Sequence, residues 1–134
     1  MLVAPLLSVD MLAADLGAGP WGALAMTSAN AAAAIERHPR RAELMALPVF
    51  AVGRRTASAA YAIGFGNVTS ADGAEKDLAD LVAAGYRGGV PLLYLAGEDR
   101  AGDLAGELTA AGVEVRTVVV YRATKAVALP SGPA

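Results

Sequence analysis

Short runs of consecutive apolar residues alternate along the chain with longer, alanine-rich stretches of helical spacing. Within each run the neighbouring positions are all apolar, which is typical of strands buried on both faces. An alternation of strand and helix predicts βαβ units around a mainly parallel sheet. The runs lie at residues 2–7, 23–26, 49–52, 92–95 and 113–120, with a short one at Val68.

Four helices are predicted between these runs, at residues 28–37, 55–63, 74–84 and 101–111. Three of them are followed by glycine, where a left-handed residue commonly ends a helix and turns the chain. These residues are Gly64, Gly85 and Gly112. The pattern therefore predicts one α/β domain with helices on both faces of the sheet.

Composition narrows the class of partner. Apolar residues make up 55% of the 134 positions and charged residues 18%, enough for one well-filled core. The net charge is −2 without a long run of one sign, so we expect neither nucleic acid nor a membrane surface as a partner. No cysteine occurs, which excludes thiolate chemistry and fits a cytoplasmic location.

Three strand-to-helix turns have a similar small and polar character: residues 27–30, 53–56 and 97–100. Because such turns meet at the carboxyl edge of a parallel sheet, each places the free N–H groups of a helix start where ligands bind. A ligand with several carboxylates suits that edge. The same residues also fit ordinary helix caps and tight turns, so both interpretations stay open.

The charged and aromatic candidates have alternatives of the same kind. Arg54, Arg55 and Arg100 could hold carboxylates or could be solvated surface charges. His38 is expected at the surface rather than as a base. No metal-ligand cluster, dinucleotide fingerprint or Walker lysine occurs, so neither metal nor nucleotide cofactor is predicted.

Four ordered motifs resemble the uroporphyrinogen-III synthase family: MTSANAAAAI, LPVFAVGRRTASAAYAIGF, LLYLAGEDRAGDLAGEL and VEVRTVVVYRA. The resemblance covers residues 3–123. It implies a lyase of tetrapyrrole and heme biosynthesis that closes hydroxymethylbilane to uroporphyrinogen III. The last pyrrole ring is inverted and water is lost, without a cofactor.

The resemblance also implies an architecture. Family members have two flavodoxin-like α/β domains joined by two linker strands, with the substrate between them. We therefore expect a linker strand at residues 1–8 and a returning strand with a tail at 117–134, the two strands pairing antiparallel or extending away. Residues 9–116 should form a flavodoxin-like three-layer sandwich with a five-stranded, mainly parallel sheet. The second domain is expected to be missing, which would leave this chain inactive alone.

Matching the motifs residue by residue gives candidate site residues. Tyr121 would hydrogen-bond the departing hydroxyl of the substrate, or else be a half-buried strand aromatic. Tyr94 and Tyr61 are expected in the core or in helix packing. The candidate substrate-binding residues are Thr27, Ser28, Gly53, Thr56 and Gly97, with backbone N–H groups from Ala29 and Ala57.

One alternative of another class stays open. A non-catalytic anion-binding or FMN-binding flavodoxin-like module could use the TSAN turn as a phosphate loop.

Overall fold

A computed structural model gives the structure, and it describes residues 6–11, 15–17, 19–86, 89–98 and 102–126. One six-stranded sheet runs through the molecule in the order β1-β6-β5-β2-β3-β4. Strands β2 to β6 are parallel, and β1 joins β6 antiparallel. The strands are β1 (Leu6–Met11), β2 (Ala23–Met26), β3 (Val49–Ala51), β4 (Val68–Ser70), β5 (Leu92–Gly97) and β6 (Val115–Ala126).

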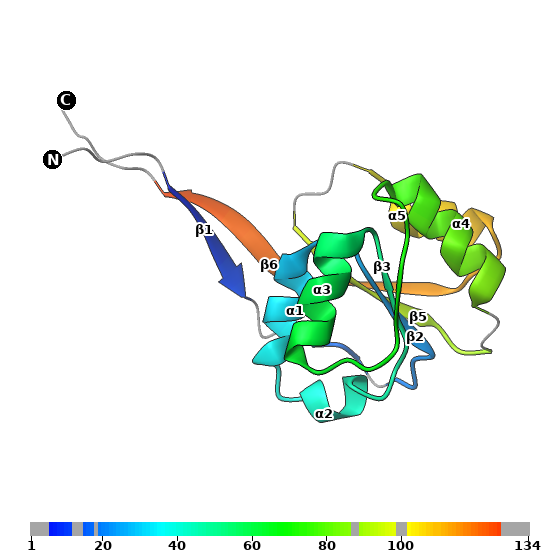
Figure 1. Cartoon of the computed structure of the whole chain (residues 1–134), viewed down its shortest axis with the longest axis horizontal. Helices are drawn as coiled ribbons and strands as arrows, with labels where there is room; N and C mark the ends of the chain where they lie inside the picture. The colour runs from blue at the N-terminus through cyan, green and yellow to red at the C-terminus, as the bar shows by residue number, and fades with distance from the viewer. Residues whose placement is uncertain (1–5, 12–14, 18, 87–88, 99–101, 127–134) are drawn as a thin grey trace, which may run out of the picture.

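Helices cover both faces of the sheet (Figure 1). One face carries α1 (Ala29–Glu36), α2 (Arg41–Leu44) and α3 (Arg54–Ile63), and the other carries α4 (Glu75–Gly85) and α5 (Leu104–Ala110). This arrangement confirms the α/β three-layer class with five parallel strands. The four-residue helix α2 was not predicted, because it is too short to show a helical period.

Two core clusters explain why the central strands β2, β3 and β5 lack polar alternation. Leu24 and Met26 of β2 belong to the cluster under α1 to α3, which we call the first core cluster. Ala23 and Ala25 of the same strand belong to the second core cluster, under α4 and α5. Successive side chains of a strand point to opposite faces, and here both faces are buried.

The strand order differs from the flavodoxin-like one that was expected. Counting β2 to β6 as first to fifth, the observed order is 3-2-1-4-5, whereas flavodoxin-like sheets have 2-1-3-4-5. Both arrangements have the same succession of strands and helices along the chain. They differ in the order of strands in the sheet, which depends on which neighbouring strand a long connection reaches. The connection through α4 spans from the edge strand β4 to β5, which pairs with β2. Strand order therefore reverses between β2 and β5, the position where doubly wound sheets form ligand crevices.

The terminal strands pair antiparallel, as predicted, but at shifted positions. Leu6 of β1 faces Ala126 and Met11 faces Tyr121, so the pairing involves residues 6–11 and 121–126. Expected positions 2–5 lie outside the described residues. Strand β6 first pairs with β5 and then continues without interruption into the ladder with β1, which projects from the rest of the domain (Figure 1). The proposed limits of linker and domain stay a prediction.

The helix-ending glycines are confirmed at two positions. Gly64 has φ 119° and Gly112 has φ 89°, both in the left-handed region. Gly85 instead is the last residue of α4, and Tyr86 follows in an extended conformation with φ −101°. This helix ends without a left-handed glycine.

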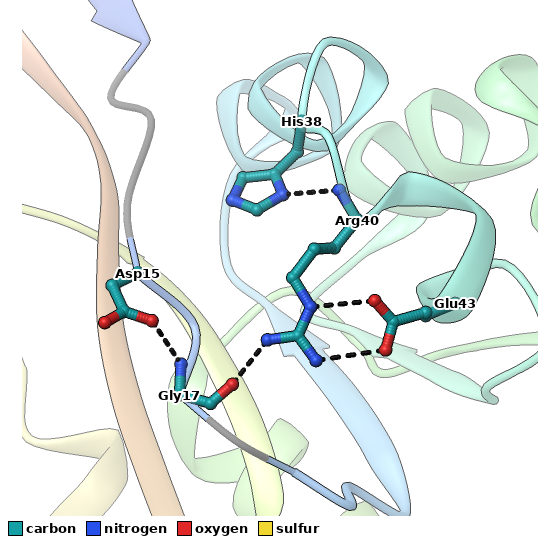
Figure 2. A network of polar contacts seen from close by, with 5 residues as sticks. All are labelled: Asp15, Gly17, His38, Arg40 and Glu43. Carbon is teal, nitrogen blue, oxygen red and sulfur yellow. Dashed lines mark hydrogen bonds and ion pairs between the residues drawn. The ribbon is translucent and has the colours of Figure 1, made fainter.

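Arg40 anchors the segment of residues 15–17, which lies between β1 and β2 (Figure 2). Its guanidinium donates a hydrogen bond to the Gly17 carbonyl and two to Glu43, at 2.8 and 3.0 Å. The same group lies 4.6 Å from the centre of the Trp21 ring, within cation–π range. The hydrogen bond to Arg40 holds the pKa of the Glu43 carboxyl below its usual value.

His38 is part of the same structure, and the expected surface position was wrong. Its side chain is 8% exposed, and Nδ1 accepts a hydrogen bond from the Arg40 backbone N–H at 3.0 Å (Figure 2). The turn between α1 and α2 directs the His38 ring toward the interior. The neighbouring arginines in the sequence suggest an exposed position instead, which is why the prediction failed. On β6, Arg116 donates from Nε to the Leu16 carbonyl at 2.9 Å and gives the segment a second anchor.

Candidate functional site

Four neighbouring strands bring the candidate residues to one edge of the sheet. Because β6, β5, β2 and β3 are parallel and adjacent, their carboxyl ends follow one another along that edge. We call the candidate residues there the carboxyl-edge row. Following the strands from β6 to β3, the row consists of Tyr121, Gly97, Thr27, Ser28, Ala29, Gly53 and Thr56.

The turn after β2 leads into α1, whose first turn has a side-chain cap but still offers hydrogen-bond donors. Ser28 is extended, and its Oγ accepts a hydrogen bond from the Asn30 N–H at 3.1 Å. The Ser28 hydroxyl hydrogen can still be donated to a ligand. Ala29 is the first helical residue, so its N–H has no acceptor within the helix. Thr27 Oγ1 lies 3.4 Å from the Tyr94 hydroxyl.

The turn after β3 starts α3 at Gly53. A Cβ there would lie 3.3 Å from the Gly73 Cα, a tight contact that would push the two turns slightly apart. The Ala57 N–H donates to the Gly53 carbonyl at 3.0 Å and is already part of the helix. Donors without a helical acceptor therefore lie one step earlier, at residues 54–56. The Thr56 side chain is 4% exposed, which favours its backbone over its hydroxyl as a ligand contact.

The four helices that start at this edge differ in charge. The first turns of α1 and α3 contain no acidic residue, and α3 begins with the exposed Arg54 and Arg55. By contrast, α4 has Glu75 and Asp77 in its first turn, and Asp103 caps α5. Carboxylates near a helix start complement its positive dipole end. The first turns of α4 and α5 therefore carry acidic residues of the protein, whereas those of α1 and α3 carry none.

A cleft of about 280 Å³ adjoins the row at the turn after β3. It is lined by Gly53, Arg54, Ala71, Asp72 and Gly73, so a positive and a negative side chain share it. A second cleft, of about 310 Å³, lies at the opposite edge of the sheet, next to Tyr86 and Glu114. Burial raises the pKa of Tyr86. None of its lining residues belongs to the carboxyl-edge row.

Tyr121 lies over Gly97 at the end of the row. The Tyr121 side chain is half-buried against the first core cluster. A Cβ placed on Gly97 would lie 2.6 Å from two carbons of the Tyr121 ring. This contact joins residues 24 positions apart, and no local pattern in the sequence indicates it.

The remaining candidates fall in different places. Tyr94 is 2% exposed, which confirms its core position. Tyr61 is 54% exposed, so its predicted packing role was wrong, although its hydroxyl donates to the Val68 carbonyl at 3.1 Å. Arg100 lies outside the described residues.

Two further searches concern metals and membranes. Within the described ranges, no group of three or more His, Cys, Asp and Glu side chains is arranged to hold a metal ion. No helix among the residues that the structure describes has the length and apolar character needed to cross a membrane.

Comparisons with known proteins agree with the fold and the motifs. The sequence model of the family described as uroporphyrinogen-III synthase HemD matches residues 2–132. The crystal structure of uroporphyrinogen-III synthetase from Helicobacter pylori 26695 matches with a TM-score of 0.70 and 22% identity. That match covers 90% of this chain and 55% of the other, so this chain spans about half the length of the Helicobacter protein. The comparison with curated proteins gave no match.

Proposed function

Because the chain belongs to the uroporphyrinogen-III synthase family, we propose that it forms one wall of a synthase's substrate cleft. The reaction closes hydroxymethylbilane to uroporphyrinogen III, inverting the last pyrrole ring and releasing water. The observation that carries the proposal is the pair of acid-free helix starts, α1 and α3, side by side at the carboxyl edge. The absence of cysteine fits a cytoplasmic enzyme, which we also propose.

The substrate suits this edge chemically. Hydroxymethylbilane carries eight carboxylates, and helix starts bind carboxylates through backbone N–H groups and the dipole. In this proposal the N–H groups of Ala29 and of residues 54–56 receive two of them, and the Ser28 hydroxyl adds a donor. Ala57 no longer belongs to the donor set, because its N–H is part of the helix.

The proposed reaction does not require a strong acid or base from the protein. Loss of the substrate hydroxyl gives a resonance-stabilised azafulvenium ion, so the enzyme mainly holds the chain folded and assists the leaving group. Tyr121 is the proposed donor to that hydroxyl. Its half-buried position at the end of the row supports this role, since the ring is held while part of it is accessible.

A second wall is part of the proposal. The row lies along one edge of one domain, and a flexible four-ring chain needs contacts on both sides to bring its ends together. We propose that this wall comes from a further domain of the synthase. The two strands β1 and β6, paired antiparallel, form the connection to it.

Ligand binding to the 134-residue chain tests the class of function. We expect uroporphyrin, with eight carboxylates, to bind more tightly than coproporphyrin, with four, and the affinity to fall with salt. Fluorescence titration of each porphyrin measures both. FMN serves as the contrasting ligand, because a single phosphate would satisfy the alternative module. Tight FMN binding, or equal affinity for the two porphyrins, would overturn the proposal.

A further inference from the structure

Strand β6 contains a bulge opposite the end of β5. Leu95 pairs with Val118 and Ala96 with Val119, but Gly97 pairs with Tyr121. Val120 is therefore an extra residue without a counterpart on β5. Bulges of this kind bend a strand and redirect the side chains that follow.

The bulge changes the face on which Tyr121 lies. In a regular strand, side chains alternate, so Tyr121 would point away from the face that buries Val118 and Val120. Those two valines are 7% and 0% exposed and belong to the first core cluster. Tyr121 packs against the same cluster. Because of the extra residue, the tyrosine is on the face of α1 and α3, whose helix starts are the acid-free ones.

Gly97 provides the space for the redirected ring. A Cβ on Gly97 would lie 2.6 Å from two ring carbons of Tyr121 and 2.8 Å from its hydroxyl oxygen. Strand β5 is buried along its whole length; its residues 92–95 are paired on both sides, and Gly97 pairs with β6. The Tyr121 ring is half-buried. A side chain at residue 97 would collide with the phenol in its present position.

We propose that the β6 bulge and Gly97 together position the Tyr121 hydroxyl at the carboxyl edge, with Gly97 as a positioning residue. The Glu98 N–H donates to the Tyr121 carbonyl at 3.0 Å and fixes the backbone on which the ring turns. This inference rests on the proposed function for what the hydroxyl does. The placement of the ring is independent of it.

The placement is tested with Gly97→Ala in the 134-residue chain labelled with ¹³C at tyrosine Cζ. The matched control is Gly66→Ala, because a Cβ there meets no atom within 4 Å. We expect the Tyr121 resonance to move in Gly97→Ala and to stay in place in the control, with the Tyr94 resonance unchanged in both. Gly97→Ala should also lower the unfolding midpoint, and should lower it much less in a Tyr121→Ala background. An unmoved Tyr121 resonance, or an equal loss in both backgrounds, would overturn the placement.

Uroporphyrin tests the role. In the parent chain we expect it to shift the Tyr121 resonance. In Gly97→Ala that shift should be lost. A normal shift in Gly97→Ala would contradict positioning. If uroporphyrin does not shift the Tyr121 resonance even in the parent chain, the proposed function of Tyr121 is wrong. The placement of the ring is then still decided by whether Gly97→Ala moves the Tyr121 resonance without ligand.

Discussion

Ser28 serves the fold and the candidate site with one hydroxyl. As an acceptor it caps α1 through the Asn30 N–H, and as a donor it can reach a carboxylate. The two roles do not compete, because they use different parts of the group. A serine at this position is therefore no evidence for either role alone, which is why the sequence left both open.

Replacing Ser28 separates those roles, because the loss of stability and the loss of affinity are measured independently. Ser28→Ala should lower the free energy of unfolding by about 1 kcal/mol through loss of the cap. It should weaken uroporphyrin binding by about tenfold or less, the cost of one hydrogen bond. Urea unfolding and fluorescence titration measure the two effects, with the exposed Ser58→Ala as control. If Ser28→Ala loses stability but binds uroporphyrin with unchanged affinity, Ser28 acts only as a helix cap.

Arg40 and Glu43 predict a pH effect. Glu43 has a lowered pKa in the folded chain because of its hydrogen bond to Arg40, so its contribution to stability is present above the unfolded pKa. That contribution is lost as pH falls through the folded pKa. In Arg40→Met the pKa of Glu43 should rise toward its ordinary value, as followed by ¹³C NMR of the carboxyl. The exposed Arg37→Met is the control, and an unchanged Glu43 pKa in Arg40→Met would contradict the pairing.

At the scale of helices and strands, continuous apolar runs and helix-ending glycines were sufficient to predict most elements. The helices α1 and α3 match their predicted ranges within one residue. Strand order was not predictable from the same signals, because β4 and β5 give identical local patterns whether or not they are neighbours. The bulge in β6 was also not predictable from the sequence, since a bulge is defined by the pairing with the partner strand. The acidic residues at the starts of α4 and α5 are visible in the sequence, and so is their absence at the starts of α1 and α3.

The start of α1 offers a direct test of backbone binding. Ala29→Pro removes the proposed N–H donor, yet proline is tolerated at the first helical position. Ser28 before it is already extended, with φ −151° and ψ 147°, as proline requires. We expect the circular dichroism spectrum to be retained and uroporphyrin affinity to fall by about tenfold. Ala29→Ser keeps the N–H and is the control. Full affinity in Ala29→Pro would exclude this donor.

At the scale of the whole molecule, one domain holds the row but not a closed cleft. In the proposed function, a single wall would bind some carboxylates but would forfeit most of the proximity effect that folds the substrate. The family and the fold could be recognised because the motifs follow the strand ends in order. The second wall is part of the proposal, and no pattern within these 134 residues indicates its geometry.

The 134-residue chain alone should therefore not speed formation of the type III isomer. Unassisted hydroxymethylbilane closes to the type I isomer, and we expect that product to predominate with and without the chain. The measurement is incubation with hydroxymethylbilane, oxidation and chromatographic separation of the isomers, with the molecular mass in solution checked alongside. Rapid type III formation by a monomer would contradict the need for a second wall.

In the proposed function, substrate carboxylates bind at the starts of α1 and α3 and not at those of α4 and α5. Titration of the ¹⁵N-labelled chain with uroporphyrin tests this most directly, because each amide reports separately. We expect saturable shifts for the amides of Ala29 and of residues 54–56, with the amides of Glu75 and Leu104 unmoved. Equal shifts at all four helix starts, or shifts confined to α4 and α5, would contradict it.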